Sequence, residues 1–146
     1  MDKNKLNGLI AKVEKPARYM GGELNMRIKA EAEFRFALCF PDTYEIGMSH
    51  LGSRIIYNIL NKRADTYCER VYAPWVDMEE QLRENNEPLF SLETRSPLRE
   101  FNVIGFSLLY EMCYTNILTV LELSGIPFLA SERGEDMPLI AAGGPC

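Results

Sequence analysis

The chain has 146 residues, of which 47% are hydrophobic, and a net charge of −5. This length suits one domain with a core of its own, and the acidic balance provides no basic field to attract nucleic acid. No apolar stretch reaches the roughly 18 residues of a membrane span, and the N-terminus lacks the apolar core of a signal peptide. We therefore expect a cytoplasmic globular protein with no membrane or nucleic-acid partner.

The four cysteines, Cys39, Cys68, Cys113 and Cys146, are widely spaced and form neither a C-x-x-C pair nor a zinc pattern. Cys39 and Cys113 lie in apolar segments, so we expect them to be buried thiols. The chain stops at a Gly-Gly turn directly after an apolar run, from which we expect a piece of a longer protein.

Residues 1–30 mix charge and glycine, and we interpret them as an N-terminal arm ahead of an α/β domain at 31–146. One short helix is predicted over 6–13, with Pro16 ending it or marking a turn. Arg18 and Tyr19 either make a specific contact or belong to a surface arm, and we favour the arm.

The run 34–40 predicts a first strand, because it is rich in aromatic residues and is stopped by Pro41-Asp42. Residues 41–49 are predicted to form a loop. A helix is expected next, with Ser49 as its N-cap. Its apolar residues recur at helical spacing: Leu51, Ile55, Ile56, Ile59 and Leu60.

Residues 66–72 predict a second strand, followed by a turn at 73–75. Asp77 is expected to cap a short polar helix that includes Met78 and Leu82. Residues 89–92 fit either a short strand or an extended loop.

The run 102–110 is nearly continuous in apolar residues, which is typical of a strand buried on both faces of a parallel sheet. A helix over 111–123 should end at Gly125. A short edge strand over 126–129, a charged turn over 131–136 and a last strand over 138–142 complete the chain. The alternation predicts an α/β class: a Rossmann-like or flavodoxin-like, doubly wound, mainly parallel sheet with helices on both faces.

Three strand ends should meet at one edge of this sheet: 42–47, 107–109 and 143–144. Ligands of open α/β sheets bind outside this edge. The three segments resemble the cobalamin-binding signature Asp-x-His-x-x-Gly, Ser-x-Leu and Gly-Gly. Asp42 and Gly47 match the first element, and Tyr44 stands where the signature has histidine.

Longer runs, at 15–19, 40–52 and 141–145, resemble the amino-terminal part of a family of bacterial radical S-adenosylmethionine (SAM) proteins. These proteins carry a cobalamin-binding-like domain ahead of a catalytic barrel, which the resemblance makes this chain's partner. Homo-oligomerisation is the other partner hypothesis. The parent protein, rather than this chain, would hold the 4Fe-4S cluster and SAM, since C-x-x-x-C-x-x-C is absent here.

The resemblance implies a role for each matching residue. Asp42 and Gly47 would shape the first loop, and Tyr44 would face the lower side of the corrin. The tail of the cofactor would lie against Ser107, Leu109, Gly143 and Gly144, where the glycines allow close approach. A phenol is a poor cobalt ligand at neutral pH, so cobalamin is expected with its own base detached and no protein imidazole on cobalt.

His50 is the one histidine of the sequence. It either reaches toward cobalt or hydrogen-bonds locally where the helix begins, and we favour the local role. The main alternative for the chain is a degenerate domain that keeps the fold for packing or dimerisation without a cofactor. A nucleotide- or flavin-binding domain is disfavoured because no G-x-G-x-x-G follows the first strand. An independent enzyme is disfavoured because no nucleophile–base pair is visible.

Overall fold

A four-stranded parallel sheet forms the centre of the molecule, which a computed structural model describes over residues 3–146. The strands lie in the order β2-β1-β3-β4, and every neighbouring pair is parallel. Their bounds are β1 Phe34–Phe40, β2 Thr66–Tyr72, β3 Val103–Ser107 and β4 Leu139–Gly143. The four strands confirm the predicted α/β class and the four main strand predictions.

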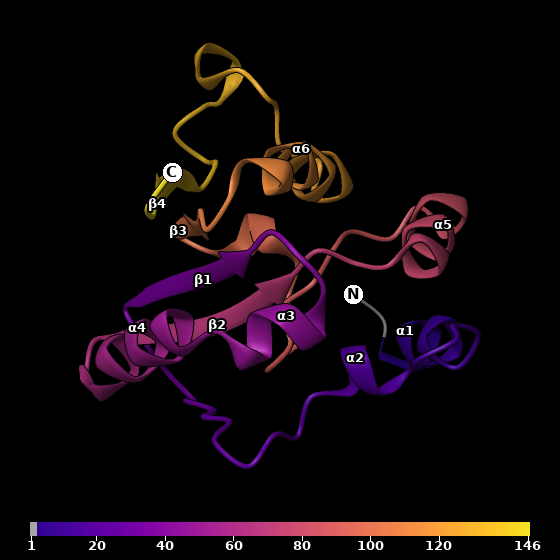
Figure 1. Cartoon of the computed structure of the whole chain (residues 1–146), viewed down its shortest axis with the longest axis horizontal. Helices are drawn as coiled ribbons and strands as arrows, with labels where there is room; N and C mark the ends of the chain where they lie inside the picture. The colour runs from indigo at the N-terminus through magenta and orange to yellow at the C-terminus, as the bar shows by residue number, and fades with distance from the viewer. Residues whose placement is uncertain (1–2) are drawn as a thin grey trace.

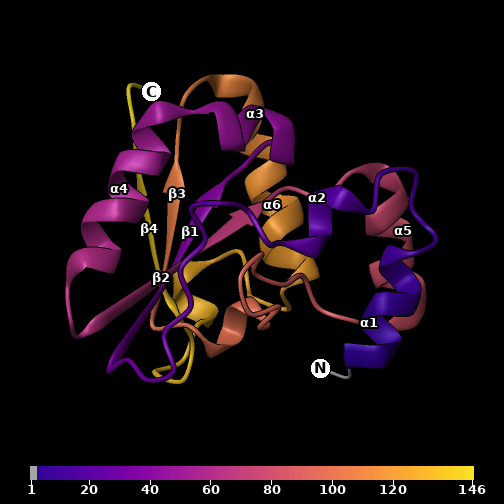
Figure 2. The same ribbon diagram turned by 90° about the horizontal axis from the view of Figure 1, so that it is seen from below.

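Helices cover both faces of the sheet, as predicted (Figure 1, Figure 2). Helix α4 (Leu51–Lys62) lies on one face, and α6 (Tyr114–Leu123) lies on the other, with α5 (Val76–Asn85) and α1 (Lys3–Ile10) beyond it. The main core fills the α6 side. A smaller cluster under α4 consists of Leu38, Tyr57 and Cys68, with Phe36 and Leu60 packed against it.

Helix α4 packs on the sheet through both polar and aromatic residues and leaves most of its apolar residues exposed. Its buried residues are Ser53, Tyr57 and Asn61. Asn61 donates to the Cys68 carbonyl at 2.9 Å and accepts from the Cys68 N–H at 3.1 Å. Leu51, Ile55, Ile56 and Ile59 are between 41% and 65% exposed.

The loop predicted over 41–49 is wrong, since α3 (Tyr44–Ser49) forms there. The predicted N-cap Ser49 is also wrong. His50 caps α4, because its Nδ1 accepts from the Ser53 N–H at 3.2 Å. This confirms the local role predicted for His50.

The N-terminal arm packs against the core. Helix α1 begins earlier than the predicted helix, and it buries Leu6, Leu9 and Ile10. Pro16 precedes a second short helix, α2 (Ala17–Met20). Residues 21–33 then run along the outer edge of β2, where Lys29 donates to the Thr66 carbonyl and Tyr67 donates to the Arg27 carbonyl.

The second half of the chain departs from prediction at Asp77 and at 126–129, and at 89–92 it has one of the two predicted alternatives. Asp77 lies within α5 and does not cap it, because the helix begins one residue before it and its N-cap is Trp75. Residues 89–92 form an extended loop with one isolated bridge, Phe90 to Pro97. The strand predicted over 126–129 is wrong, as these residues are irregular.

Three single-turn 3-10 helices complete the fold: η1 Leu98–Glu100, η2 Glu111–Cys113 and η3 Ala130–Glu132. Helix α6 begins later than predicted, because η2 occupies its first turn, and it is followed by Gly125 as expected. Among residues 3–146, we find no helix with the length and apolar character needed to span a membrane.

Candidate functional site at the carboxyl edge of the sheet

The loops after β1, β3 and β4 meet at the carboxyl edge of the sheet, as the parallel topology requires. The chain leaves β1 toward β2 on one side and reaches β3 on the other, so the topological switch point lies between β1 and β3. Ligands of open α/β sheets bind at such a point. The predicted site residues lie around it, but they form two separate groups.

Asp42 joins the two sides of the switch point. Its Oδ1 accepts from the Thr43 N–H at 2.6 Å, and its Oδ2 accepts from the Tyr110 hydroxyl, which belongs to the loop after β3. Asn116 of α6 adds a bond to the Pro41 carbonyl at 3.0 Å. Both carboxylate oxygens of Asp42 are therefore engaged in shaping the edge, and Tyr110 is a site residue that no sequence pattern indicated.

Tyr44 and Gly47 lie on the β2 side of the edge. The Tyr44 hydroxyl donates to Glu23 Oε1 at 3.2 Å, and its ring meets the Tyr72 ring edge-on at 5.6 Å. Burial, and then the Glu23 carboxylate, raise the pKa of Tyr44, so this phenol keeps its proton at neutral pH. Gly47 lets α3 pack closely, because a Cβ there would lie 2.3 Å from the Tyr72 ring.

Ser107 and Gly143 lie together on the β4 side of the edge, paired across β3 and β4. Gly143 has open space where a Cβ would be. Gly144 differs, since a Cβ there would lie 1.8 Å from the Leu108 carbonyl oxygen. Leu109 follows at the rim and is 37% exposed. Gly143 thus lines open space, whereas Gly144 packs against the loop after β3.

The face that Ser107 and Gly143 share is the α4 side of the sheet. A Cβ on Gly105 would lie 2.4 Å from the ring of Phe36, which packs in the small cluster under α4. Side chains alternate along a strand, so every second residue of β3 and its partners in β4 face that side. Gly105 is buried under that ring. The residues beyond it, toward the carboxyl edge, are small and at least partly exposed, and we call them the small-residue trough: Ser107, Ala141 and Gly143.

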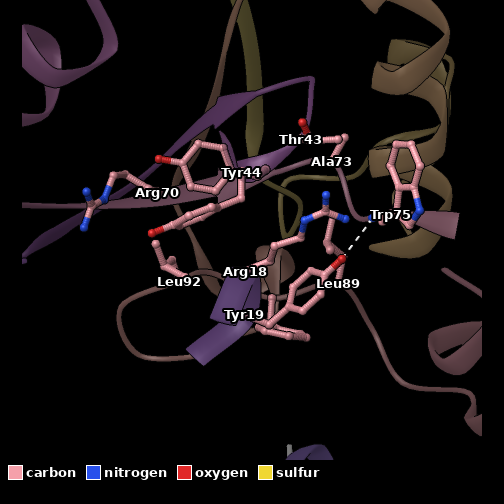
Figure 3. Close-up of a pocket in the computed structure, with 11 residues that line it drawn as sticks. Arg18, Tyr19, Thr43, Tyr44, Arg70, Ala73, Trp75, Leu89 and Leu92 are labelled. Carbon is pink, nitrogen blue, oxygen red and sulfur yellow. Dashed lines mark hydrogen bonds between the residues drawn. The ribbon is translucent and has the colours of Figure 1, made fainter. Parts of the chain in front are cut away.

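A small enclosed cavity lies on the β2 side, next to Tyr44 (Figure 3). Arg18, Tyr19, Trp75 and Leu89 are among its lining residues, and its volume of about 20 Å³ suits a single water. The Tyr19 hydroxyl accepts a hydrogen bond from the backbone N–H of Trp75 at 3.0 Å, and the Arg18 guanidinium lies 5.2 Å from the centre of the Trp75 ring. Arg18 and Tyr19 therefore make specific contacts, contrary to the favoured prediction.

Arg70 is a buried charged residue that sequence reasoning missed. Its Nε donates to Glu93 Oε1 at 2.6 Å, and its guanidinium also contacts Asn25 at 3.3 Å and Glu23 at 3.5 Å. Since Glu23 accepts from Tyr44, Arg70 connects α3 to the arm and to the loop at 91–96. The signal was present, because the second predicted strand contains Glu69-Arg70 at its centre.

Complete burial raises the pKa of Glu93 to about 7, although Arg70 opposes the shift. The neighbouring Glu69 is fully buried and satisfied by Arg35 at 2.7 Å, Ser91 at 2.7 Å and the Thr94 N–H at 3.1 Å. These carboxylates bind the loop at 91–96 to β2. Their donors are all internal, which indicates a structural role.

Cys39 and Cys113 are buried thiols, as predicted, and burial raises the pKa of Cys39. Within residues 3–146, no group of three or more His, Cys, Asp or Glu side chains is placed to hold a metal ion. The single histidine is occupied as the cap of α4.

Comparison with protein families gives one match. The model of the family described as "Radical SAM proteins, N-terminal" matches residues 52–146, which is more than half of the chain. The matched part includes α4, the last three strands and the helices between them. Nothing matches significantly among curated proteins or among solved structures.

Proposed function

Because the chain belongs to the family of N-terminal regions of radical SAM proteins, we propose that it is a cofactor-presenting domain that binds cobalamin. In this proposal, the tail of the cofactor lies in the small-residue trough, and the macrocycle lies over the carboxyl edge. The domain would hold and orient the cofactor, while a catalytic region elsewhere in the protein would hold the 4Fe-4S cluster and SAM.

One observation carries this proposal: the partly exposed Ser107 is paired side by side with Gly143, where a Cβ would meet no atom within 4 Å. The trough contains no side chain larger than Ser, and its Ser hydroxyl can donate or accept a hydrogen bond. An elongated group can therefore approach the backbone of both strands. The rim at the same edge carries exposed apolar side chains suited to a large flat ligand: Ile46, Leu109 and Met112.

The residues present fit cobalamin without a protein ligand on cobalt. The His50 Nδ1 accepts the bond of the helix cap, and in this tautomer Nε2 carries the ring proton. The Tyr44 hydroxyl is protonated and bonded to Glu23. Neither side chain is free to replace the cofactor's own base. Bound cobalamin supplies a cobalt centre that can carry a methyl group. This chain's own residues would contribute the trough and the rim.

A second candidate function is a packing module without cofactor. Two observations favour it: Tyr110 and Asp42 bridge the switch point, and the enclosed cavity beside Tyr44 admits only a water-sized group. In such a domain the trough would be a surface for another part of the protein.

The test is an absorbance titration with hydroxocobalamin followed by desalting, on the wild type and on three variants. Ser107→Tyr and Gly143→Val place bulk in the trough, whereas Ala142→Val adds similar bulk to the opposite face of β4 as the matched control. We expect the wild type and Ala142→Val to retain cobalamin with a base-off spectrum and the two trough variants to lose it. Folded wild type that retains none would favour the packing module.

A further inference from the structure

The two edge strands of the sheet differ in whether other parts of the chain cover them. The outer edge of β2 is covered by residues 21–33 and by the side chain of Asn61. In the part of the chain that the structure describes, β4 has no neighbour on its outer side, and its five residues carry no charge. Proteins protect exposed edges with charge, proline or a covering segment. Edge β4 has none of these along its length, which marks it as a surface for pairing.

The face beside this edge is apolar and lacks a covering helix. On the amino half of β3 and β4, Val103 and Leu139 face the α4 side, and Leu139 is 66% exposed. Ile56 lies one turn before Leu60 on α4, on the side that packs with Phe36 of β1, and Ile59 lies beside it.

The size of the uncovered face suits one helix. Strands lie about 4.8 Å apart, so β3 and β4 together offer a width of roughly 10 Å. Packed helices lie about 8–10 Å apart. A helix laid beside α4 would therefore cover Leu139 and Val103 and contact Ile56 and Ile59.

We propose that this surface, the β4 docking surface, binds a strand-and-helix unit from the radical SAM region of the same protein. It consists of the outer edge of β4 with Val103, Leu139, Ile56 and Ile59. The unit's strand would pair with β4, and its amphipathic helix would fill the place beside α4. Family membership supports this occupant, because an N-terminal region adjoins the region that does the chemistry. The proposal does not require cobalamin.

A second copy of the chain fits this surface poorly. A two-fold axis normal to the sheet would pair β4 antiparallel with its copy and keep both α4 helices on the same face. The β3 and β4 strands of both copies would then lie between those helices, so Ile56 and Ile59 would stay uncovered. A parallel strand followed by a crossover helix covers edge and face together.

The experiment measures thiol labelling at single cysteines introduced at Ile59→Cys and Leu139→Cys, with Asn58→Cys on the exposed polar side of α4 as the matched control. Each is placed on a Cys146→Ser background, because the thiol of Cys146 is exposed. Labelling rates are compared between this 146-residue chain and the full-length radical SAM protein. We expect labelling at 59 and 139 to be slower by about tenfold or more in the full-length protein, with labelling at 58 unchanged.

Equal rates at 59 and 139 in the two proteins would overturn the proposal. Protection that grows with the concentration of the 146-residue chain would assign the surface to a second copy and overturn it as well. Protection that appears only after hydroxocobalamin is added would assign it to the cofactor site. Protection at 59 and 139 without cobalamin retention would support the docking surface and count against the proposed function, so the two failures are distinguishable.

Discussion

The adjacent glycines at the end of β4 provide a paired test of the structure, because they look alike in sequence and differ in surroundings. A Cβ on Gly144 would lie 1.8 Å from the Leu108 carbonyl oxygen, and a Cβ on Gly143 would meet no atom within 4 Å. Gly144→Ala should therefore destabilise the domain, and Gly143→Ala should not.

The magnitude follows from the overlap. Real Cβ atoms essentially never approach other heavy atoms closer than 3.0 Å, so Gly144→Ala forces the end of β4 and the loop after β3 apart by about 1 Å. Overpacking of this kind costs about 1–3 kcal/mol. Gly143→Ala restricts the unfolded chain without a clash, so we expect a change between zero and about 1 kcal/mol in favour of folding.

The free energies of unfolding are measured by urea denaturation, and hydrogen exchange at the Leu108 amide is followed in parallel. That amide donates to the Gly143 carbonyl at 2.8 Å, so its protection reports whether the end of β4 stays paired. Gly144→Ala should lower both the stability and the protection. Equal stability of the two variants, with the Leu108 amide protected in both, would refute the close packing of Gly144.

Two further predictions concern the buried ion pair and the helix cap. The pKa of Glu93 is about 7 in the folded protein against 4.5 for an ordinary glutamate, so the folded state holds an extra proton between these values. This extra proton stabilises the folded state fully below pH 4.5, and the stabilisation is lost as the pH rises through 7. The free energy of unfolding should fall by about 3 kcal/mol over this range. Glu93→Gln should remove this pH slope in urea unfolding, whereas an unchanged slope would contradict the assignment. His50→Ala should lose about 0.5–2 kcal/mol and His50→Ser should keep the cap, which thermal unfolding can measure; equal losses in both variants would exclude capping by the His50 side chain.

Much of the fold was predictable because the four strands are marked by their own sequences. The runs at 34–40 and 66–72 combine β-propensity with turn residues at their ends, and the predicted bounds match the observed ones. The parallel order then follows from helices between strands. The strand predicted at 126–129 failed, because an apolar run of four residues around Pro127 has no intrinsic preference strong enough to form a strand without a neighbour.

The candidate site was predictable only in part, because sequence places residues at strand ends without telling which way they face. Ser107 and Gly143 were expected to lie together, and the register of β3 and β4 pairs them. Tyr44 was expected at the same site, yet its hydroxyl is bound by Glu23 of the arm. That contact spans 21 residues and depends on buried Arg70. A long-range ion-pair network of this kind leaves no periodic signal.

The two flanks of the sheet suggest how such a domain would work within a larger protein. The β2 flank is closed by the arm and by the Arg70 network, which joins β2 to the arm and to the loop at 91–96. The β4 flank carries the small-residue trough at the carboxyl ends of β3 and β4, and the strand residues of the β4 docking surface that present apolar side chains, Val103 and Leu139, lie at their amino ends. A cofactor held in the trough would then lie next to the docked region, and Gly143→Val and Ile59→Cys probe the two ends independently. Loss of cobalamin in Gly143→Val, with labelling at Ile59→Cys still slow in the full-length protein that carries Gly143→Val, would show that holding the cofactor and docking the catalytic region use separate parts of one flank.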